Sequence, residues 1–185
     1  MGTVKLYLKD FIRYRYLLYN LISRDFKLKY RRSVLGVAWS VLNPLLMCGV
    51  MVVVFGNLFQ FRGEGITNYP VYLVIGQLMF TFFRESTTMA MGSVMANAML
   101  LRKVYIPKYI FPLEKTCFGL VNYFFSFVAL IIIMLITRSP LHPTVLLAVY
   151  PILTMFLFSL GVGLVLSTMA VFFRDVIHLW EVFTT

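Results

Sequence analysis

The chain has 185 residues, of which 61% are hydrophobic and 17% aromatic, and its mean hydropathy is +0.86. These values lie outside the range of an ordinary soluble domain and predict a membrane protein. In a soluble protein, the formal net charge of +10 would indicate a nucleic acid partner. Because the basic residues cluster at the ends of apolar segments, we interpret the charge as a signal of membrane orientation and expect no nucleic acid partner.

Residues 1–33 are predicted to form an amphipathic helix that lies in the membrane interface. Within residues 4–28, apolar side chains such as Leu21 and Phe26 share one helical face, and cationic side chains share the opposite face. The simplest role for this helix is an anchor. A sharper interpretation is that its basic residues attract anionic headgroups or a phosphorylated lipid substrate. These residues are Arg24, Lys27, Lys29, Arg31 and Arg32.

Four apolar segments then follow, and each is long enough to cross a membrane. A hydrocarbon core about 30 Å thick needs roughly 20 helical residues, and no water satisfies backbone polar groups at that depth. We therefore predict an all-α polytopic membrane protein. Its predicted spans are 34–58, 70–96, 114–136 and 146–172.

The distribution of Lys and Arg orients these spans. Nine of these residues precede the first span, four lie between positions 97 and 115, and the linkers around Arg62 and Arg138 carry one each. The positive-inside rule then places the N-terminus and the 97–113 segment in the cytoplasm. The expected location is the cytoplasmic (inner) membrane, with several passes.

The 97–113 segment is too apolar for a solvated loop and too charged for a span. We expect Pro107 and Pro112 to break it into a short helix and a turn. Its apolar residues would then be exposed as a docking surface for another protein, although an ordinary interfacial loop is an alternative. These apolar residues are Leu100, Leu101, Val104, Tyr105 and Ile106.

Arg84 and Glu85 fall near the middle of the second predicted span. An unpaired charge there costs about 3 kcal/mol, so each is expected to face a partner or a wet cavity. They either line a conduit or form structural ion pairs, and the aromatic residues Phe82, Phe83 and Tyr123 are further candidates for the conduit wall. Glycines in the spans are expected to let helices approach closely. These glycines are Gly49, Gly56, Gly161 and Gly163.

After the fourth span the chain turns at residues 173–175 and begins a fifth helical segment. A helix that starts in the last residues of a chain is unusual. We therefore expect the sequence to be a C-terminally incomplete fragment of a single transmembrane domain that lacks at least one further span.

Three ordered motifs carry a resemblance to a known family. The first runs from Ser23-Arg-Asp-Phe-Lys-Leu-Lys-Tyr-Arg-Arg through Leu35-Gly-Val-Ala-Trp to Pro44-Leu-Leu. The second is Leu101-Arg-Lys-Val-Tyr-Ile-Pro, and the third is Phe172-Phe-Arg-Asp-Val. In these motifs the chain resembles the permeases of type-2 ABC transporters that export polysaccharides, including O-antigen, capsule and teichoic acids. Ile106 is a mild departure, because the family usually has phenylalanine there.

The resemblance implies six spans in the full-length protein, a homodimer, and two copies of a cytoplasmic ABC ATPase subunit as partners. It also implies a lipid-linked polysaccharide substrate and contact with membrane lipids. The 97–113 segment would be the coupling helix that receives the motion of the ATPase. Its coupling contacts would be Leu101, Arg102, Lys103, Tyr105, Pro107 and Lys108. The sequence has no G-x-x-x-x-G-K-[ST] phosphate loop, so ATP and Mg²⁺ are expected on the partner and no cofactor on this chain.

The predicted function is therefore the transport subunit of an ATP-driven exporter of lipid-linked polysaccharide. One alternative is a type-2 ABC exporter of a drug or a simple lipid. An integral membrane enzyme, such as a lipid-phosphate transferase, would need clustered acidic residues or histidines. The only histidines, His142 and His178, lie on opposite sides of the membrane in this topology, so we expect no catalytic or metal site.

Overall fold

The structure, a computed structural model, describes residues 2–31, 36, 38–58, 69–136 and 147–185. Of residues 2–13, 48, 51–58, 69, 70, 133 and 136, only the backbone is described. This part of the chain forms seven helices and no strand, which confirms the all-α prediction. The helices are α1 (Gly2–Tyr30), α2 (Ala38–Leu58), α3 (Tyr69–Ala96), α4 (Ala98–Lys103), α5 (Ile110–Ile136), α6 (Val149–Phe172) and α7 (Asp175–Phe183).

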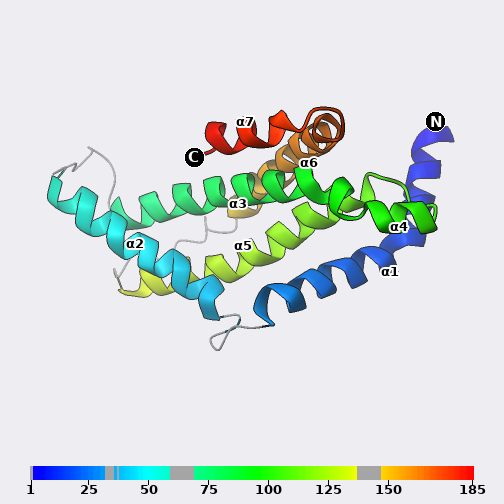
Figure 1. Cartoon of the computed structure of the whole chain (residues 1–185). Coiled ribbons are helices and arrows are strands. Elements are labelled where there is room, and N and C mark those ends of the chain that lie inside the picture. Colours follow the sequence, from blue (N-terminus) through cyan, green and yellow to red (C-terminus); the bar gives the residue numbers. More distant parts are fainter. Residues whose placement is uncertain (1, 32–35, 37, 59–68, 137–146) are drawn as a thin grey trace.

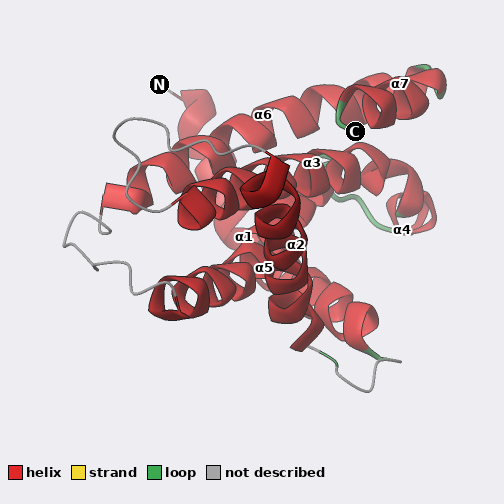
Figure 2. Cartoon of the chain, turned by 90° about the vertical axis from the view of Figure 1, so that its left-hand side faces the viewer, coloured by secondary structure: helices red, strands yellow, loops and turns green. Residues whose placement is uncertain are grey.

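Helix α3 is the centre of the molecule. It packs along α5 on one side and against α6 and α7 on the other (Figures 1 and 2). Helix α2 crosses the α3–α5 pair, and α1 runs beside α5 (Figure 1). The long helices α2, α3, α5 and α6 occupy the four segments in which spans are predicted.

Two helices in the described part are long and apolar enough to cross a membrane by length and composition alone. They contain Ile110–Ile132 of α5 and Val149–Phe172 of α6. A shorter apolar stretch, Ala38–Met47, lies in α2. Helix α3 has the length of a span but carries Arg84 and Glu85, so its hydropathy is lower.

Two glycines allow the central helices to approach closely. A Cβ atom at Gly119 of α5 would overlap the Oγ atom of Ser86 in α3, and one at Gly163 of α6 would lie 2.8 Å from the Cβ of Ala90. The prediction for Gly163 is confirmed. Among the described residues, no atom lies within 4 Å of a Cβ added at Gly49 or Gly161, so within that part of the chain the prediction is wrong for these two glycines; Gly56 lies outside the residues whose side chains are described.

The turn between α1 and α2 depends on a glycine conformation. Gly36 has a φ angle of 47°, in the left-handed region that residues with a Cβ seldom adopt. Its carbonyl accepts a hydrogen bond from the Trp39 amide at 3.3 Å, next to the first residue of α2. The spacing of the Leu-Gly-x-x-Trp motif therefore has a local reason, because the glycine makes the turn and the tryptophan lies in the first turn of the helix.

Pro44 lies inside α2 and has no N–H group to donate to the carbonyl of Ser40, one turn earlier. The Ser126 hydroxyl of α5 takes the place of the missing donor. Its Oγ atom lies 3.4 Å from the Ser40 carbonyl oxygen and 3.2 Å from the Asn122 carbonyl oxygen, so its single proton is shared between them. A neighbouring helix thus satisfies the group that proline leaves free, which is how membrane helices tolerate this residue.

The breaks in the 97–113 segment differ from their prediction at the second proline. Helix α4 ends at Lys103, and α5 begins at Ile110, earlier than the predicted start at 114. The Pro107 carbonyl accepts from the Ile110 amide at 3.1 Å, so the turn before α5 is made at the first proline. Pro112 does not break a helix, because it lies in the first turn of α5, where backbone N–H groups have no helical partner.

The two glycines of α6 give a matched test of packing. Gly163→Ala places a methyl group against Ala90, which is rigid, so we expect a loss of about 1–3 kcal/mol from overpacking, partly offset by the better helix propensity of alanine. Gly161→Ala meets open space and should not destabilise the protein. Thermal unfolding in detergent should therefore rank Gly161→Ala at or above the wild type and Gly163→Ala below it. Equal midpoints for the two variants would contradict the packing described here.

Candidate functional site

A chamber of about 440 Å³, lined by both apolar and polar side chains, lies between the end of α1 and helices α2, α3 and α5. Three side-chain amides line it, together with several hydroxyl groups and an apolar wall that includes Met47 and Leu78. The polar groups belong to Tyr30, Ser40, Asn43, Gln77, Thr81, Asn122, Tyr123 and Ser126. Its volume is within the range of about 300–1,000 Å³ that is usual for small-molecule sites. We call this cavity the chamber.

Asn122 is the buried polar residue of the chamber, with 6% of its surface exposed. Its Oδ1 atom accepts a hydrogen bond from the Tyr30 hydroxyl at 3.4 Å, and that hydroxyl also contacts Ser40. Its Nδ2 atom has no hydrogen-bond partner among the described residues. Because buried polar atoms in folded proteins are nearly always paired, an unpaired donor in a cavity wall indicates a missing partner.

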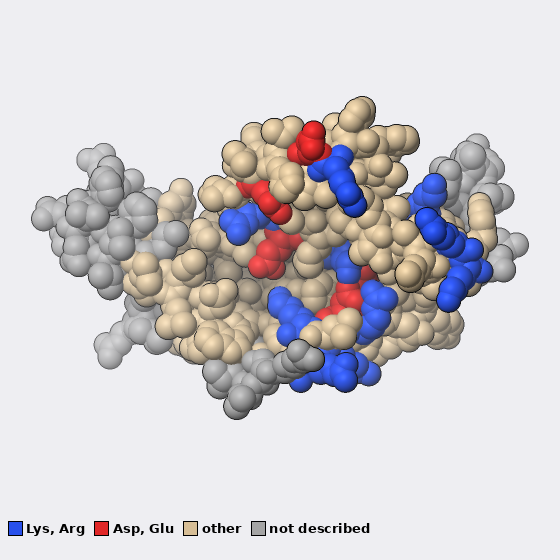
Figure 3. Space-filling view, in the orientation of Figure 1, with Lys and Arg blue, Asp and Glu red and all other residues tan. Residues whose placement is uncertain are grey.

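The mouth of the chamber is charged. Lys29, Arg84 and Glu85 line both the chamber and an adjoining outer hollow of about 570 Å³, which Asp25 and Phe118 also border. Figure 3 shows basic and acidic side chains gathered around a depression in the middle of this face. All three mouth residues are exposed, and within the described part of the chain neither Arg84 nor Glu85 forms an ion pair. Arg84 and Glu85 were each expected to face either a charged partner or a wet cavity. Within the described part of the single chain, both face the open hollow.

The predicted aromatic residues divide between two sides of α3. Phe82 and Tyr123 meet edge to face, with ring centroids 5.6 Å apart, and both line the chamber. Phe83 lies elsewhere, stacked on Phe158 of α6 at 5.6 Å and edge-on to Trp180 of α7 at 5.9 Å. The structure does not bring Phe83 to the chamber, because adjacent helical residues project about 100° apart.

The basic residues predicted to bind phosphate are also dispersed. Only Lys29 reaches the chamber. Arg24 pairs with Asp25 at 2.9 Å, Lys27 and Arg31 are exposed, and Arg32 lies outside the described residues.

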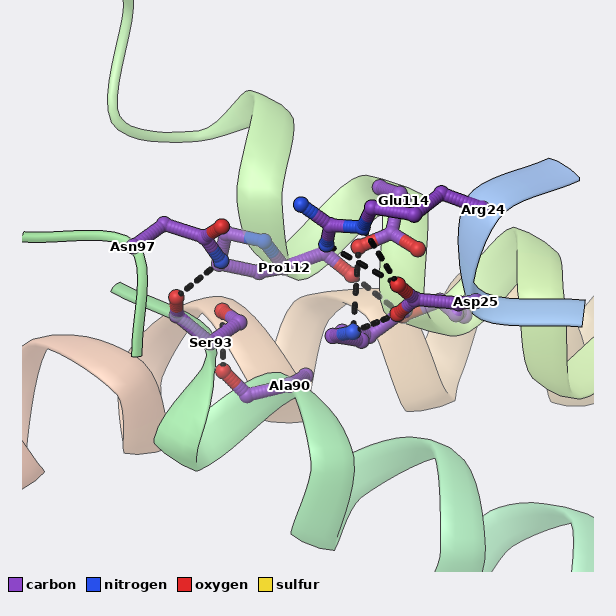
Figure 4. A network of polar contacts seen from close by, with 9 residues as sticks. Arg24, Asp25, Ala90, Ser93, Asn97, Pro112 and Glu114 are labelled. Carbon is purple, nitrogen blue, oxygen red and sulfur yellow. Dashed lines mark hydrogen bonds and ion pairs between the residues drawn. The ribbon is translucent and has the colours of Figure 1, made fainter. Parts of the chain in front are cut away.

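An ionic network fastens α1 to α5 (Figure 4). Asp25 of α1 is paired with Lys115 of α5 and with the neighbouring Arg24. Lys115 also lies 3.4 Å from the carboxylate of Glu114, a side chain with 0% exposure and no hydrogen bond within the described part. One lysine therefore serves two carboxylates, and Glu114 depends on it for compensation of its charge.

The electrostatics of Asp25 follow from this network. Burial alone would raise the pKa of the Asp25 carboxyl. Hydrogen bonds from Lys115 and Arg24, together with their positive charges, outweigh burial and hold that pKa below its ordinary value.

Helix α1 covers part of the predicted coupling segment. Leu21 packs against Ile106, Ile110 and Phe111, so the prediction that Ile106 is exposed is wrong. Leu100 and Leu101 are also half-buried in this cluster. At Leu21, the apolar face of α1 therefore packs against the coupling segment and the start of α5.

Fewer of the predicted residues of the coupling segment are exposed than expected, and the exposed ones combine three cations with a tyrosine and two apolar side chains. Tyr105 has 91% of its surface exposed, while its carbonyl lies 3.4 Å from the Tyr14 hydroxyl of α1. Pro107 is half-buried. We call the exposed set the coupling surface, and it consists of Met99, Arg102, Lys103, Val104, Tyr105 and Lys108.

Sequence reasoning missed the amides of the chamber. Asn43, Gln77 and Asn122 stand in otherwise apolar segments, and polar residues at membrane depth are a recognised signal of function. That signal was available, but a single sequence did not indicate that the three amides meet. Among the described residues, no group of three or more His, Cys, Asp or Glu side chains could hold a metal ion.

The described part is all-α and contains two helices that are long and apolar enough to cross a membrane, which is consistent with a helical membrane protein. Residues 16–185 match the family model of the ABC-2 type transporter. The chain therefore belongs to the ABC-2 type transporter family, as its sequence motifs predict.

The chain is similar to named polysaccharide export proteins. It is 30% identical over 162 residues to the O-antigen export system permease protein RfbA of Klebsiella pneumoniae, covering 86% of this chain and 61% of the relative. It is 29% identical over 172 residues to the RfbA permease of Myxococcus xanthus, covering 92% and 65%. The capsule polysaccharide export inner-membrane protein CtrC of Neisseria meningitidis serogroup A is 29% identical over 166 residues, covering 87% and 61%. The chain thus spans less than two thirds of the length of these relatives.

The ionic network predicts an order of effects on stability. Lys115→Met leaves Glu114 and Asp25 without their shared cation and should cost roughly 3 kcal/mol, the low end of the range for a buried pair. Asp25→Asn leaves the Lys115–Glu114 pair in place and should cost about 1–2 kcal/mol. Adding Glu114→Gln to Lys115→Met should recover part of the loss. Denaturant titration in detergent would measure this order, and a Lys115→Met variant as stable as Asp25→Asn would contradict it.

The lowered pKa of Asp25 predicts how the α1–α5 junction responds to acid. Its folded pKa is below the unfolded value of about 3.9, so the stabilisation is fully present above that value and is lost as the pH falls through the folded pKa. Hydrogen exchange of residues 14–30, after correction for intrinsic rates, should rise as the pH falls below about 4. Asp25→Asn should remove most of this rise. An equal rise in both proteins would mean that another group controls the junction.

Proposed function

We propose that this chain is the permease subunit of an ATP-driven exporter that moves lipid-linked cell-surface polysaccharide across the cytoplasmic membrane. The observation that carries the proposal is the similarity, over 86% to 92% of the chain, to permeases named for O-antigen and capsule polysaccharide export. This similarity favours a polysaccharide over a drug or a simple lipid as the cargo. Teichoic acid export belongs to the same class of transport.

The partners we propose are a second copy of the permease and two copies of a cytoplasmic ABC ATPase subunit. Membership of the family supports an ATPase partner, and this sequence has no phosphate loop of its own. ATP and Mg²⁺ would be bound by that partner, so the chain would be a transport subunit rather than an enzyme. The excess of Lys and Arg before residue 34 and between residues 97 and 115 supports a cytoplasmic location for both segments.

The coupling surface is the proposed contact with the ATPase. Tyr105 offers a large, fully accessible aromatic ring, while Arg102 and Lys103 lie beside it at the end of α4. Aromatic and arginine side chains contribute most to protein interfaces. Behind this surface, Ile106 packs on Leu21 of α1 and Ile110 begins α5, so a push on the segment would bear on two helices.

The charged mouth of the chamber is the proposed contact with the polar part of the substrate. Lys29 and Arg84 are cations at the edge of a hollow that Asp25 and Glu85 also border. Because Asp25 is already paired with Lys115 and Arg24, the two cations are available to an anionic phosphate group. Together with Arg24, Lys27, Arg31 and Arg32, they would hold the phosphorylated carrier near α1.

Charge reversal at the coupling surface tests this function. Arg102→Glu combined with Lys103→Glu should abolish export of the polysaccharide, because like charges would then face the ATPase surface that binds these cations. Both side chains are exposed, so insertion and stability should remain close to those of the wild type. Surface staining of exported polysaccharide, with membrane fractionation of the permease, measures the two effects.

Arg15→Glu is the matched control, since Arg15 is an exposed cation of α1 that lies outside the coupling surface and outside the three motifs. It should leave export largely unchanged. Normal export by the Arg102 and Lys103 double variant would overturn the proposed contact. Unchanged cell-surface polysaccharide after deletion of the gene would overturn the function itself.

A further inference from the structure

We propose that the chamber is a binding site for a neutral sugar ring, with the Asn122 side chain as its buried hydrogen-bond donor. This inference deepens the proposed function, because it assigns a sugar unit of the cargo to a cavity inside one permease chain.

The first step is the chemistry of the chamber wall. Amides and hydroxyls both donate and accept hydrogen bonds, and sugar hydroxyls have the same dual capacity. Asn43, Gln77 and Asn122 contribute three amides from three different helices, α2, α3 and α5. A lipid tail would leave these groups without partners at a cost of about 1–3 kcal/mol for each buried one, so the wall disfavours an apolar occupant.

The second step is the unpaired donor. Asn122 lines the chamber, its side-chain oxygen accepts from Tyr30, and its buried Nδ2 group has no partner among the described residues. Ser126, one turn further along α5, already shares its proton between two carbonyl oxygens. Among the described residues, Asn122 is therefore a buried wall residue with a hydrogen-bond donor left for a ligand.

The third step is the shape and charge of the cavity. The rings of Trp39, Tyr30 and Tyr123 belong to the wall, and flat aromatic faces suit the apolar face of a sugar ring. The cations of the wall, Lys29 and Arg84, border both the chamber and the outer hollow, and thus mark its mouth. A phosphate group of the substrate would therefore bind at the mouth, where the cations are. The amides inside the chamber are uncharged and suit a neutral sugar ring.

The test uses the full-length permease in lipid vesicles, with its native cysteines replaced by alanine and Met47→Cys as a reporter. Met47 belongs to the apolar wall of the chamber and is accessible, so a methanethiosulfonate reagent should modify the new thiol. The probe is octyl glucoside below the concentration that dissolves the vesicles. Octyl tetraethylene glycol, which has the same chain and no ring, is its matched control. Octyl glucoside should slow modification in a saturable way, and the control amphiphile should not.

Two variants locate the site. Asn122→Leu keeps a similar volume and removes the donor, so it should raise the half-protecting concentration of octyl glucoside about 10-fold, the upper range for one lost hydrogen bond. Thr81→Val is nearly isosteric, is expected to fold, and should raise that concentration about 2- to 5-fold. Asn97→Leu makes the same change at a buried asparagine outside the chamber and should leave it unchanged.

Three results would overturn the proposal. They are an absence of protection by octyl glucoside, equal protection by both amphiphiles, and unchanged half-protecting concentrations in both the Asn122→Leu and Thr81→Val proteins. The assay needs neither ATP nor export. If octyl glucoside gives no protection while the permease still exports polysaccharide, the chamber proposal is wrong and the proposed function stands. The proposed function fails separately, if deletion of the gene leaves the cell-surface polysaccharide unchanged.

Discussion

The fold depends on one constraint, which is that polar groups on helices packed among apolar side chains must find partners without water. The chain meets it locally at Pro44, where a serine of α5 supplies the donor that proline lacks. A second example joins two helices at Thr87. Its hydroxyl accepts a hydrogen bond from the Trp180 indole of α7 at 3.2 Å and donates its own proton to a carbonyl of α3. The first of these bonds links α2 with α5, and the second links α3 with α7.

Helix α3 shows how four surfaces can share one helix. Toward α5 and α6, the small residues Ser86 and Ala90 leave room for a glycine of each neighbouring helix. Phe83 stacks on a phenylalanine of α6, and Thr87 is hydrogen-bonded to α7. The fourth surface, with Arg84 and Glu85, faces the open hollow. Arg84 and Glu85 are both exposed at this hollow, and a wet cavity is one of the settings in which charges on a membrane helix are tolerated.

Sequence periodicity and hydropathy predicted the long helices because each one has to be apolar over its whole length, a property that can be read without knowledge of its neighbours. Contacts between helices are different. Gly161 and Gly163 are alike in sequence, and only the direction of each residue around α6 determines that Gly163 meets Ala90. Ile106 was predicted to be exposed from its place in a cytoplasmic segment, and it is buried because Leu21, 85 positions earlier in the chain, packs on it. In the same way, Arg84 and Glu85 marked the mouth of the chamber, but Asn122 became part of the candidate site only through the position of Tyr30.

Helix α1 joins the two regions that the proposed function needs. Leu21 lies against Ile106 behind the coupling surface, and Tyr30, nine residues later, touches Asn122 in the chamber. At a rise of about 1.5 Å per residue these contacts are about 13 Å apart on one helix. Between them, Asp25 holds the helix to Lys115 of α5, so α1 cannot slide along α5 without breaking a partly buried ion pair. Because Asn122 lies seven residues after Lys115 on α5, the same ion pair also holds Tyr30 beside Asn122. The contact behind the coupling surface and the contact in the chamber therefore share one junction between α1 and α5.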